Sequence, residues 1–309
     1  MKLLLAILAV TLGLLALAEL GLRVSVGFGS PLIYIADENI GYLLAPEQRT
    51  RRFGNLIEIN QYSMRSSTIT PLPSDSNWRV LLLGDSVANG GWWTDQSQTI
   101  SEEIAKQWSQ KSDRPSDRSS LEVLNASANS WGPRNELAYL QKYGLFGAKA
   151  LILLINTDDL FAKAPSSLVV GRDRNYPNTK PPTAIAEVLS RYVLPNPKLS
   201  PEIPAEKDVV AANLEAIAEI QKIVELANGQ FILALTPLLR EAIEPGPRDY
   251  EIKTRQRLTE FTEKQQILYI DFLPIFQSNS NPQIFYRDGI HLSPEGNLEV
   301  SKTLTHALK

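Results

Sequence analysis

Short aliphatic runs alternate with longer amphipathic stretches from residue 78 to the end of the chain. The runs are continuous and rich in leucine or β-branched residues, as is typical of strands buried on both faces of a sheet. They are RVLLLG (79–84), LEVLN (121–125), KALILLIN (149–156), QFILALT (230–236) and QILYIDF (266–272), and the helical stretches are 99–110, 134–144, 208–229 and 248–265. This alternation predicts an α/β domain with a parallel sheet and helices on both sides.

Two segments interrupt this rhythm. Residues 111–119 (KSDRPSDRS) predict a solvated loop. Residues 163–206 are rich in proline and too long for an ordinary connection. Because this insertion follows the end of a strand, we expect either a lid or substrate-binding flap, or a surface excursion without such a role.

The N-terminal segment, residues 1–27, is apolar. Lys2 precedes an uncharged run from Leu3 to Ala18, which is about 24 Å long as a helix and therefore short for a bilayer core unless residues 20–26 extend it. The small residues at 16–18 favour a cleaved signal peptide, whereas the resumption of apolar residues after Glu19 favours an uncleaved anchor. We favour the anchor; both readings predict export of the rest of the chain, facing the periplasm or the outside.

Residues 28–76 form an extension before the regular domain, which we place at 77–309. The stretch LIEINQYSM (56–64) alternates like a strand, so we expect a hairpin packed on the main domain. Arg51, Arg52 and Arg65 in this extension are expected to be solvated, as most arginines are.

The composition and charge of the chain limit its possible partners, cofactors and catalytic groups. The chain has 309 residues, 43% hydrophobic and 21% charged, which suits one main domain. A net charge of −3 makes nucleic acid an unsuitable partner. Cysteine is absent and there are two histidines, so thiolate catalysis and disulfides are excluded, and we expect no metal or organic cofactor.

The first regular strand ends in Gly-Asp-Ser, which delivers Ser86 to the carboxyl edge of the sheet, where α/β folds bind ligands. A serine nucleophile needs a base, usually a histidine oriented by a carboxylate. Asp288 and His291 lie three residues apart, just before a helix that we expect to start with Ser293 as its N-cap. His306 falls in the last turn of that helix, which leaves His291 as the candidate base.

Four motifs follow each other in a characteristic order: GDSVANG (84–90), NASANSWG (125–132), INTDDL (155–160) and DGIHLSPEG (288–296). With them the chain resembles the SGNH, or GDSL-type, hydrolase family over residues 78–308. The resemblance implies a three-layer α/β/α flavodoxin-like fold. It also implies that Ser86 is the nucleophile, His291 the general base and Asp288 the residue that orients His291.

The family's oxyanion hole combines the N–H of the nucleophile, here Ser86, with a glycine N–H from the second motif and an asparagine side chain from the third. Here Ser130 stands at the glycine position, with Gly132 two residues later, and Asp158 stands at the asparagine position. An ionised carboxylate cannot donate a hydrogen bond. Either Asn156 supplies the amide, or burial keeps Asp158 protonated, or the hole is impaired.

Three functions remain open. The first is hydrolysis of a carboxylic ester, on a small molecule or on an envelope carbohydrate or lipid, and the second is acyl transfer between carbohydrates. The third is a binding or assembly role for a protein whose site has decayed. Trp92, Trp93 and Trp131 could line the pocket or serve as ordinary packing.

Overall fold

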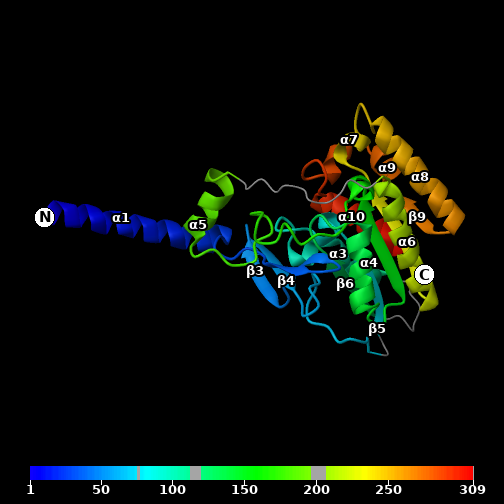
Figure 1. Ribbon diagram of the computed structural model, residues 1–309, viewed down its shortest axis with the longest axis horizontal. Coiled ribbons are helices and arrows are strands. Elements are labelled where there is room, and N and C mark those ends of the chain that lie inside the picture. The colour runs from blue at the N-terminus through cyan, green and yellow to red at the C-terminus, as the bar shows by residue number, and fades with distance from the viewer. Residues whose placement is uncertain (75–76, 112–119, 196–206, 309) are drawn as a thin grey trace.

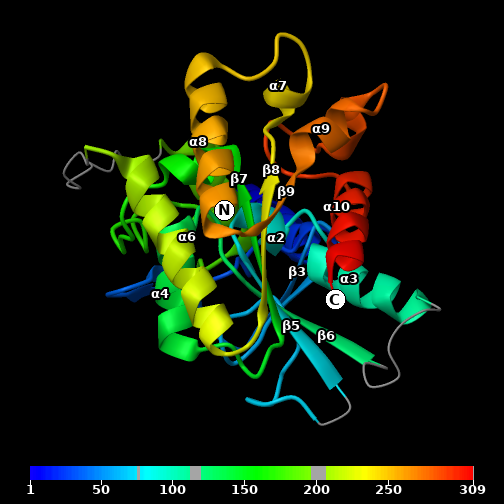
Figure 2. The same cartoon turned by 90° about the vertical axis from the view of Figure 1, so that its right-hand side faces the viewer.

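A five-stranded parallel sheet forms the centre of the computed structural model, which describes residues 1–74, 77–111, 120–195 and 207–308. Its strands run in the order β6-β5-β7-β8-β9. They are β5 (Asn77–Gly84), β6 (Ser120–Ser127), β7 (Ala150–Asn156), β8 (Gln230–Thr236) and β9 (Leu268–Asp271) (Figures 1 and 2). All five predicted strands and their parallel arrangement are confirmed.

Helices cover both faces of the sheet, because alternate strand residues point to opposite sides. On one face, Leu81 and Leu151 pack with Ile217 in one core cluster. On the other, Leu82 and Ile152 pack with Val300 in a second cluster. The first face carries α4 (Pro133–Tyr143), α6 (Val209–Leu226) and α8 (Asp249–Gln265), and the second carries α3 (Ile100–Gln110), α9 (Phe272–Gln277) and α10 (Pro294–Ala307). The three-layer α/β/α fold is therefore confirmed.

Several short helices occupy the connections at the carboxyl edge of the sheet. They are α2 (Ser86–Asn89), η2 (Gln96–Gln98), η4 (Thr157–Phe161), α7 (Leu239–Ala242) and η6 (Pro282–Phe285). The pattern of apolar residues is too short in these segments to predict a helix.

An apolar helix projects from the domain at the N-terminus (Figure 1). It comprises α1 (Lys2–Gly21) and a π-helical continuation, η1 (Leu22–Val26). An 18-residue stretch within these 25 residues has a mean hydropathy of 2.5, and it is not buried inside the protein. At ~1.5 Å per residue the two segments span roughly 37 Å, which is long enough for a bilayer core. The helix is therefore a candidate membrane span, although a signal sequence has the same properties.

The extension contains two antiparallel hairpins where one was expected. The first pairs β1 (Tyr34–Asp37) with β2 (Gly41–Leu44), and the second pairs β3 (Gln48–Arg52) with β4 (Asn55–Ile59). Side chains of both hairpins belong to the same core cluster as one face of the main sheet.

The prediction that Arg52 and Arg65 are solvated is wrong. Arg65 is fully buried and donates to the carbonyls of Asn89 (3.0 Å) and Thr94 (2.6 Å), and Gln96 Oε1 accepts from its Nε at 3.0 Å. Burial lowers the pKa of Arg65 to about 10. This guanidinium thus holds the loop after α2 against the extension, a tertiary role that single-sequence patterns do not reveal.

The described part of the insertion packs against the extension. It includes α5 (Ala184–Val188) and the π-helical η5 (Leu189–Val193). Glu187 forms a buried ion pair with Arg52, with 2.8 Å between Oε1 and Nη2. Residues 196–206 of the insertion and 112–119 of the predicted loop lie outside the described residues.

Candidate active site

Ser86, His291 and Asp288 form a continuous hydrogen-bonded chain, although Ser86 and His291 are 205 positions apart in the sequence. His291 Nε2 lies 3.0 Å from Ser86 Oγ. On the other side of the ring, His291 Nδ1 lies 2.8 Å from Asp288 Oδ2 and 3.0 Å from Oδ1. This is the arrangement in which a histidine can take a proton from a serine while a carboxylate fixes its orientation.

Ser86 reaches this position through the turn at the end of β5. A side chain at Gly84 would lie 2.5 Å from the Leu154 carbonyl oxygen, so only glycine lets α2 pack this closely on the neighbouring strand β7. Asp85 caps α2, because its Oδ1 accepts from the Val87 N–H at 2.8 Å. Ser86 is thereby the first residue of a short helix at the carboxyl edge of the sheet.

The loop that carries His291 is fixed at both ends. Asp288 Oδ1 accepts from the backbone N–H groups of Ile290 (3.0 Å) and His291 (2.9 Å), which forms a tight turn. Ser293 accepts from the Gly296 N–H at 3.1 Å, so it is the predicted N-cap of α10. Partial burial opposes ionisation of Asp288, but these N–H groups and the His291 ring outweigh it and hold its pKa below the ordinary value. Asp288 is therefore ready to accept from the imidazole.

A second carboxylate touches the serine. Asp85 Oδ2 accepts from Ser86 Oγ at 3.1 Å and from Asn156 Nδ2 at 2.9 Å. Burial raises the pKa of Asp85, although hydrogen bonds from Val87 and Ser86 and the charge of His291 act against the rise. Asn156 thus positions Asp85, and its amide does not line the cavity beside Ser86.

The structure separates the remaining residues predicted for the oxyanion hole. Ser130 lines the cavity beside Ser86, with a φ of 58° that favours glycine, and its Oγ accepts from Tyr176 at 2.9 Å. Gly132 is not a cavity residue, and its N–H is donated to Asn135 Oδ1 at 3.1 Å. A side chain at Gly132 would lie 2.3 Å from the Ala162 Cβ, so glycine serves close packing here.

Asp158, the other residue predicted for the oxyanion hole, lies outside the cavity beside Ser86. Its side chain is exposed and does not line the cavity that contains Ser86. Desolvation of the carboxyl raises its pKa; Glu251 adds to the rise, and Arg240 and Arg248 oppose it. These neighbours belong to α7 and to the start of α8, and Asp158 is not among the residues that share a cavity with Ser86.

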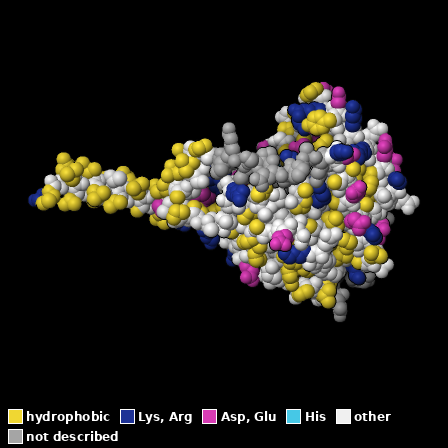
Figure 3. All heavy atoms as spheres, viewed as in Figure 1, with side chains coloured by type: hydrophobic (Ala, Val, Ile, Leu, Met, Phe, Trp, Pro, Cys, Tyr) yellow, Lys and Arg dark blue, Asp and Glu magenta, His cyan; other side chains and the backbone are white. Residues whose placement is uncertain are grey.

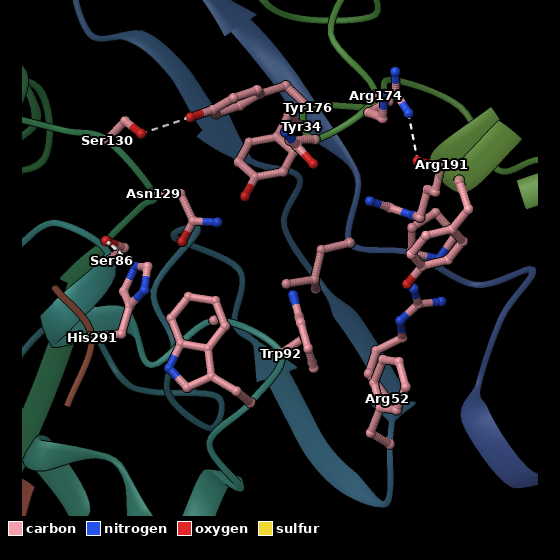
Figure 4. A pocket seen from close by; sticks show the side chains of 17 residues that line it. Tyr34, Arg52, Ser86, Trp92, Asn129, Ser130, Arg174, Tyr176, Arg191 and His291 are labelled. Atoms are coloured by element: carbon pink, nitrogen blue, oxygen red, sulfur yellow. Dashed lines mark hydrogen bonds between the residues drawn. The ribbon is translucent and has the colours of Figure 1, made fainter. Parts of the chain in front are cut away.

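Asn129 is a polar cavity residue that the sequence analysis missed. Figure 4 shows its amide at the same end of the cavity as Ser86 and His291. In the described part of the chain, its buried Oδ1 has no hydrogen-bond partner. Rotation of the amide would present either the oxygen or the NH₂ group at this point. The signal in the sequence was its place next to Ser130, in the second motif.

A cavity of about 440 Å³ opens beside Ser86, within the usual range of small-molecule sites. Trp92 and Trp93 line it, and the Trp93 ring lies 4.2 Å from the His291 ring. Trp131 instead is buried in the core, where its Nε1 donates to the Tyr42 carbonyl at 3.0 Å. Of the three tryptophans, two are therefore cavity walls and one is packing.

Metal ligation receives no support from the side-chain positions. Within residues 1–74, 77–111, 120–195 and 207–308, no group of three or more His, Asp or Glu side chains is arranged to hold a metal ion.

Residues 82–298 match the family model described as the GDSL-like lipase/acylhydrolase family, which is more than two thirds of the chain. The chain belongs to this family. All four motifs lie within the matched range. Family membership is therefore consistent with the observed proximity of Ser86, Asp288 and His291.

Solved structures of other GDSL proteins are similar to this chain at low identity. A member of the lipolytic G-D-S-L family from Veillonella parvula is 11% identical, with 75% of this chain and 98% of that chain covered and a TM-score of 0.46. An acetylxylan esterase from Geobacillus stearothermophilus, solved as a catalytic mutant, is 11% identical over 74% and 93%, with a TM-score of 0.47. A lipase/acylhydrolase from Enterococcus faecalis is 13% identical over 74% and 94%, with a TM-score of 0.45. No curated protein matches the sequence.

Proposed function

We propose that this GDSL-family chain is a serine-dependent ester hydrolase with Ser86 as nucleophile, His291 as general base and Asp288 as the residue that orients His291. The observation that carries the proposal is the 3.0 Å contact between Ser86 Oγ and His291 Nε2, continued at 2.8 Å from His291 Nδ1 to Asp288. Contacts of this length suit proton transfer from a hydroxyl to an imidazole.

The proposed reaction has two halves. Ser86 Oγ attacks the acyl carbon while its proton moves to His291 Nε2, and the ester C–O bond then breaks as His291 returns the proton to the departing alkoxide. In the second half, His291 takes a proton from water, and the resulting hydroxide attacks the Ser86 acyl ester. Protonation of Ser86 Oγ by His291 restores the enzyme and releases the carboxylic acid.

The negative charge on the carbonyl oxygen needs hydrogen-bond donors. We assign this role to the backbone N–H groups of Ser86 and Ser130 and to the side-chain amide of Asn129. The support is that all three residues line one cavity and that the Asn129 Oδ1 has no hydrogen-bond partner among the described residues. In this arrangement Asp158, exposed and outside that cavity, neither helps nor hinders the oxyanion.

Hydrolysis of p-nitrophenyl acetate by the full-length chain tests the proposal. Ser86→Ala should lower kcat by about a thousandfold or more, because it removes the nucleophile. The matched control is Ser97→Ala, which removes the hydroxyl of an exposed serine on the nearby η2 and should keep wild-type activity. Equal activity of the Ser86→Ala and Ser97→Ala chains would refute the proposed nucleophile.

We also propose that residues 1–27 anchor the chain in a membrane, with the extension 28–76 linking this anchor to the hydrolase domain 77–309. The support is the length and exposure of the apolar helix. In addition, Glu19 near its end accepts from the N–H groups of Ala184 (2.8 Å) and Ile185 (3.0 Å). This contact ties the end of the apolar helix to the insertion.

A further inference from the structure

The end of the cavity remote from Ser86 is rich in positive charge. Arg52, Arg174 and Arg191 are among the lining residues, and no Asp or Glu is among the lining residues that the structure describes (Figure 4). Arg52 comes from β3 of the extension, whereas Arg174 and Arg191 come from the insertion. The two segments that distinguish this chain from a bare α/β/α domain thus build one cationic wall opposite the proposed nucleophile.

One carboxylate behind this wall serves two of the guanidinium groups. Glu187 Oε1 accepts from Arg52 Nη2 and from Arg191 Nε, both at 2.8 Å. Burial opposes the ionisation of Glu187, but the hydrogen bonds from Arg52 and Arg191 outweigh it and lower its pKa. The two cations and the single anion leave one net positive charge, which is only partly screened because the Arg52 and Glu187 side chains are buried.

Arg191 is the member of this group that can reach a ligand. It uses Nε for Glu187, and among the described residues its two terminal nitrogens have no hydrogen-bond or ion-pair partner. Its side chain is 21% exposed. Arg191 and Tyr34 line the same cavity (Figure 4). A planar guanidinium with two free terminal nitrogens suits a carboxylate.

The walls between the two ends are mainly aromatic. They include Tyr34, Tyr176, Tyr192, Phe53, Trp92 and Trp93, while the aliphatic contribution is Pro31 and Leu32. Flat rings with polar edges fit the apolar face and hydroxyl rim of a sugar ring, whereas a long acyl chain needs aliphatic walls. The cavity is therefore better suited to a small acyl group on a ring than to a fatty acyl chain.

We propose that the substrates are acyl esters of acidic carbohydrates, with Arg191 binding the sugar carboxylate while the ester lies at Ser86. This inference rests on the proposed hydrolase function and names its substrate class. Arg52 and Glu187 are positioning residues for Arg191, since they hold its Nε edge and leave its terminal nitrogens towards the cavity.

Binding to a chain that cannot turn over tests the inference separately from catalysis. The full-length Ser86→Ala protein is titrated in a calorimeter with trigalacturonic acid and with neutral galactotriose. We expect the acidic trimer to bind at least about tenfold more tightly, as for a charge-assisted hydrogen-bond pair. This preference should shrink as salt is added.

Arg191→Gln in the same Ser86→Ala background should abolish the preference for the acidic trimer. Arg191→Lys keeps the charge without the fork and should retain part of it, which covers the case that the glutamine variant folds poorly. Arg172→Gln is the matched control, because Arg172 is exposed on the same insertion and outside this cavity, and it should keep the preference in full.

Equal affinity for the two trimers, binding of neither, or an undiminished preference in both Arg191 variants would overturn the inference. The outcomes remain distinct from those of the esterase test. If Ser86→Ala leaves ester hydrolysis intact, the proposed function fails whatever the sugar binding. If hydrolysis depends on Ser86 and the trimers bind alike, only the substrate class is wrong.

Discussion

Ser86 lies between two hydrogen-bond acceptors, His291 Nε2 at 3.0 Å and Asp85 Oδ2 at 3.1 Å. A hydroxyl has one proton, so the two acceptors compete for it. Burial raises the pKa of Asp85, whereas the hydrogen bonds from Val87 and Ser86 and the charge of His291 oppose the rise. Asn156, which donates to the same carboxyl, holds it in this position. Asp85 therefore supports the turn and the serine, while the proposed mechanism assigns the role of base to His291.

Substitutions of Asn129 and Asp158 are expected to affect turnover differently. Asn129→Ala should lower kcat on p-nitrophenyl acetate by about a hundredfold with a smaller change in KM, because an oxyanion donor acts mainly in the transition state.

Asp158→Asn should change kcat by less than about twofold, since Asp158 is exposed outside the cavity. Steady-state kinetics decide, and a marked gain in turnover for Asp158→Asn would show instead that its carboxylate faces the oxyanion.

The buried carboxyl group of Glu136 should make the free energy of unfolding depend on pH. Both of its carboxyl oxygens are buried without a hydrogen-bond partner in the described chain, and burial, with the nearby Asp85, raises its pKa well above the ordinary 4.5. The folded state keeps a proton that the unfolded chain loses, so stability should fall as the pH rises above about 4.5. Glu136→Gln should raise the free energy of unfolding at pH 8 by about 1–3 kcal/mol, and by less at pH 5.

Urea unfolding at the two pH values measures this effect. Glu215→Gln is the control, because Glu215 is exposed on α6 and its neutralisation should leave the pH dependence as in the wild type. A Glu136→Gln protein that is less stable than the wild type at pH 8 would mean that the Glu136 carboxylate has an ionic partner.

At the scale of elements, the insertion joins the apolar helix to the cavity. Glu19 of α1 accepts from the first N–H groups of α5, and the residues after α5 include Arg191 and Tyr192 of the cavity wall. Leu189, Val193 and Leu194 of the same segment are exposed, and Figure 3 shows apolar side chains gathered where α1 meets the domain. If α1 spans a bilayer, this segment lies at the bilayer surface.

A probe on Leu194 tests that placement. The chain contains no cysteine, so Leu194→Cys can carry a single environment-sensitive fluorophore on the full-length protein in vesicles. Its fluorescence should be quenched by nitroxide lipids. The control is Leu226→Cys, because Leu226 is 77% exposed at the end of α6, which Figure 1 shows on the far side of the domain from α1. Equal quenching at the two sites, or none at Leu194, would contradict the membrane-proximal orientation.

At the scale of the whole molecule, the sheet and its helices were predictable because burial on both faces leaves unbroken aliphatic runs, as in 149–156. The proximity of Ser86, Asp288 and His291 was also predictable, since the order of the motifs places all three at the carboxyl edge of the sheet. Gly132 and Asn156 show the limit of such alignment: each is in the expected motif, but its hydrogen bonds go to Asn135 and Asp85.

The remaining features depend on contacts between distant segments. Arg65 is buried because four backbone carbonyls from two segments converge on it, and no local pattern announces that convergence. The proposed roles of Asn129 and Arg191 likewise depend on the cavity, which is lined by residues of the extension, the insertion and the carboxyl edge of the sheet. The spacing of apolar residues shows which face of a helix or strand is buried, but it does not show which other segment packs against that face.

The most direct test of the central claim is mass-spectrometric mapping of a fluorophosphonate probe after brief exposure of the full-length protein. We expect one adduct, on Ser86, that is absent in Ser86→Ala and forms far more slowly in His291→Ala, because the imidazole no longer takes the hydroxyl proton. An adduct on another residue, or labelling of Ser86 at the same rate without His291, would contradict the account.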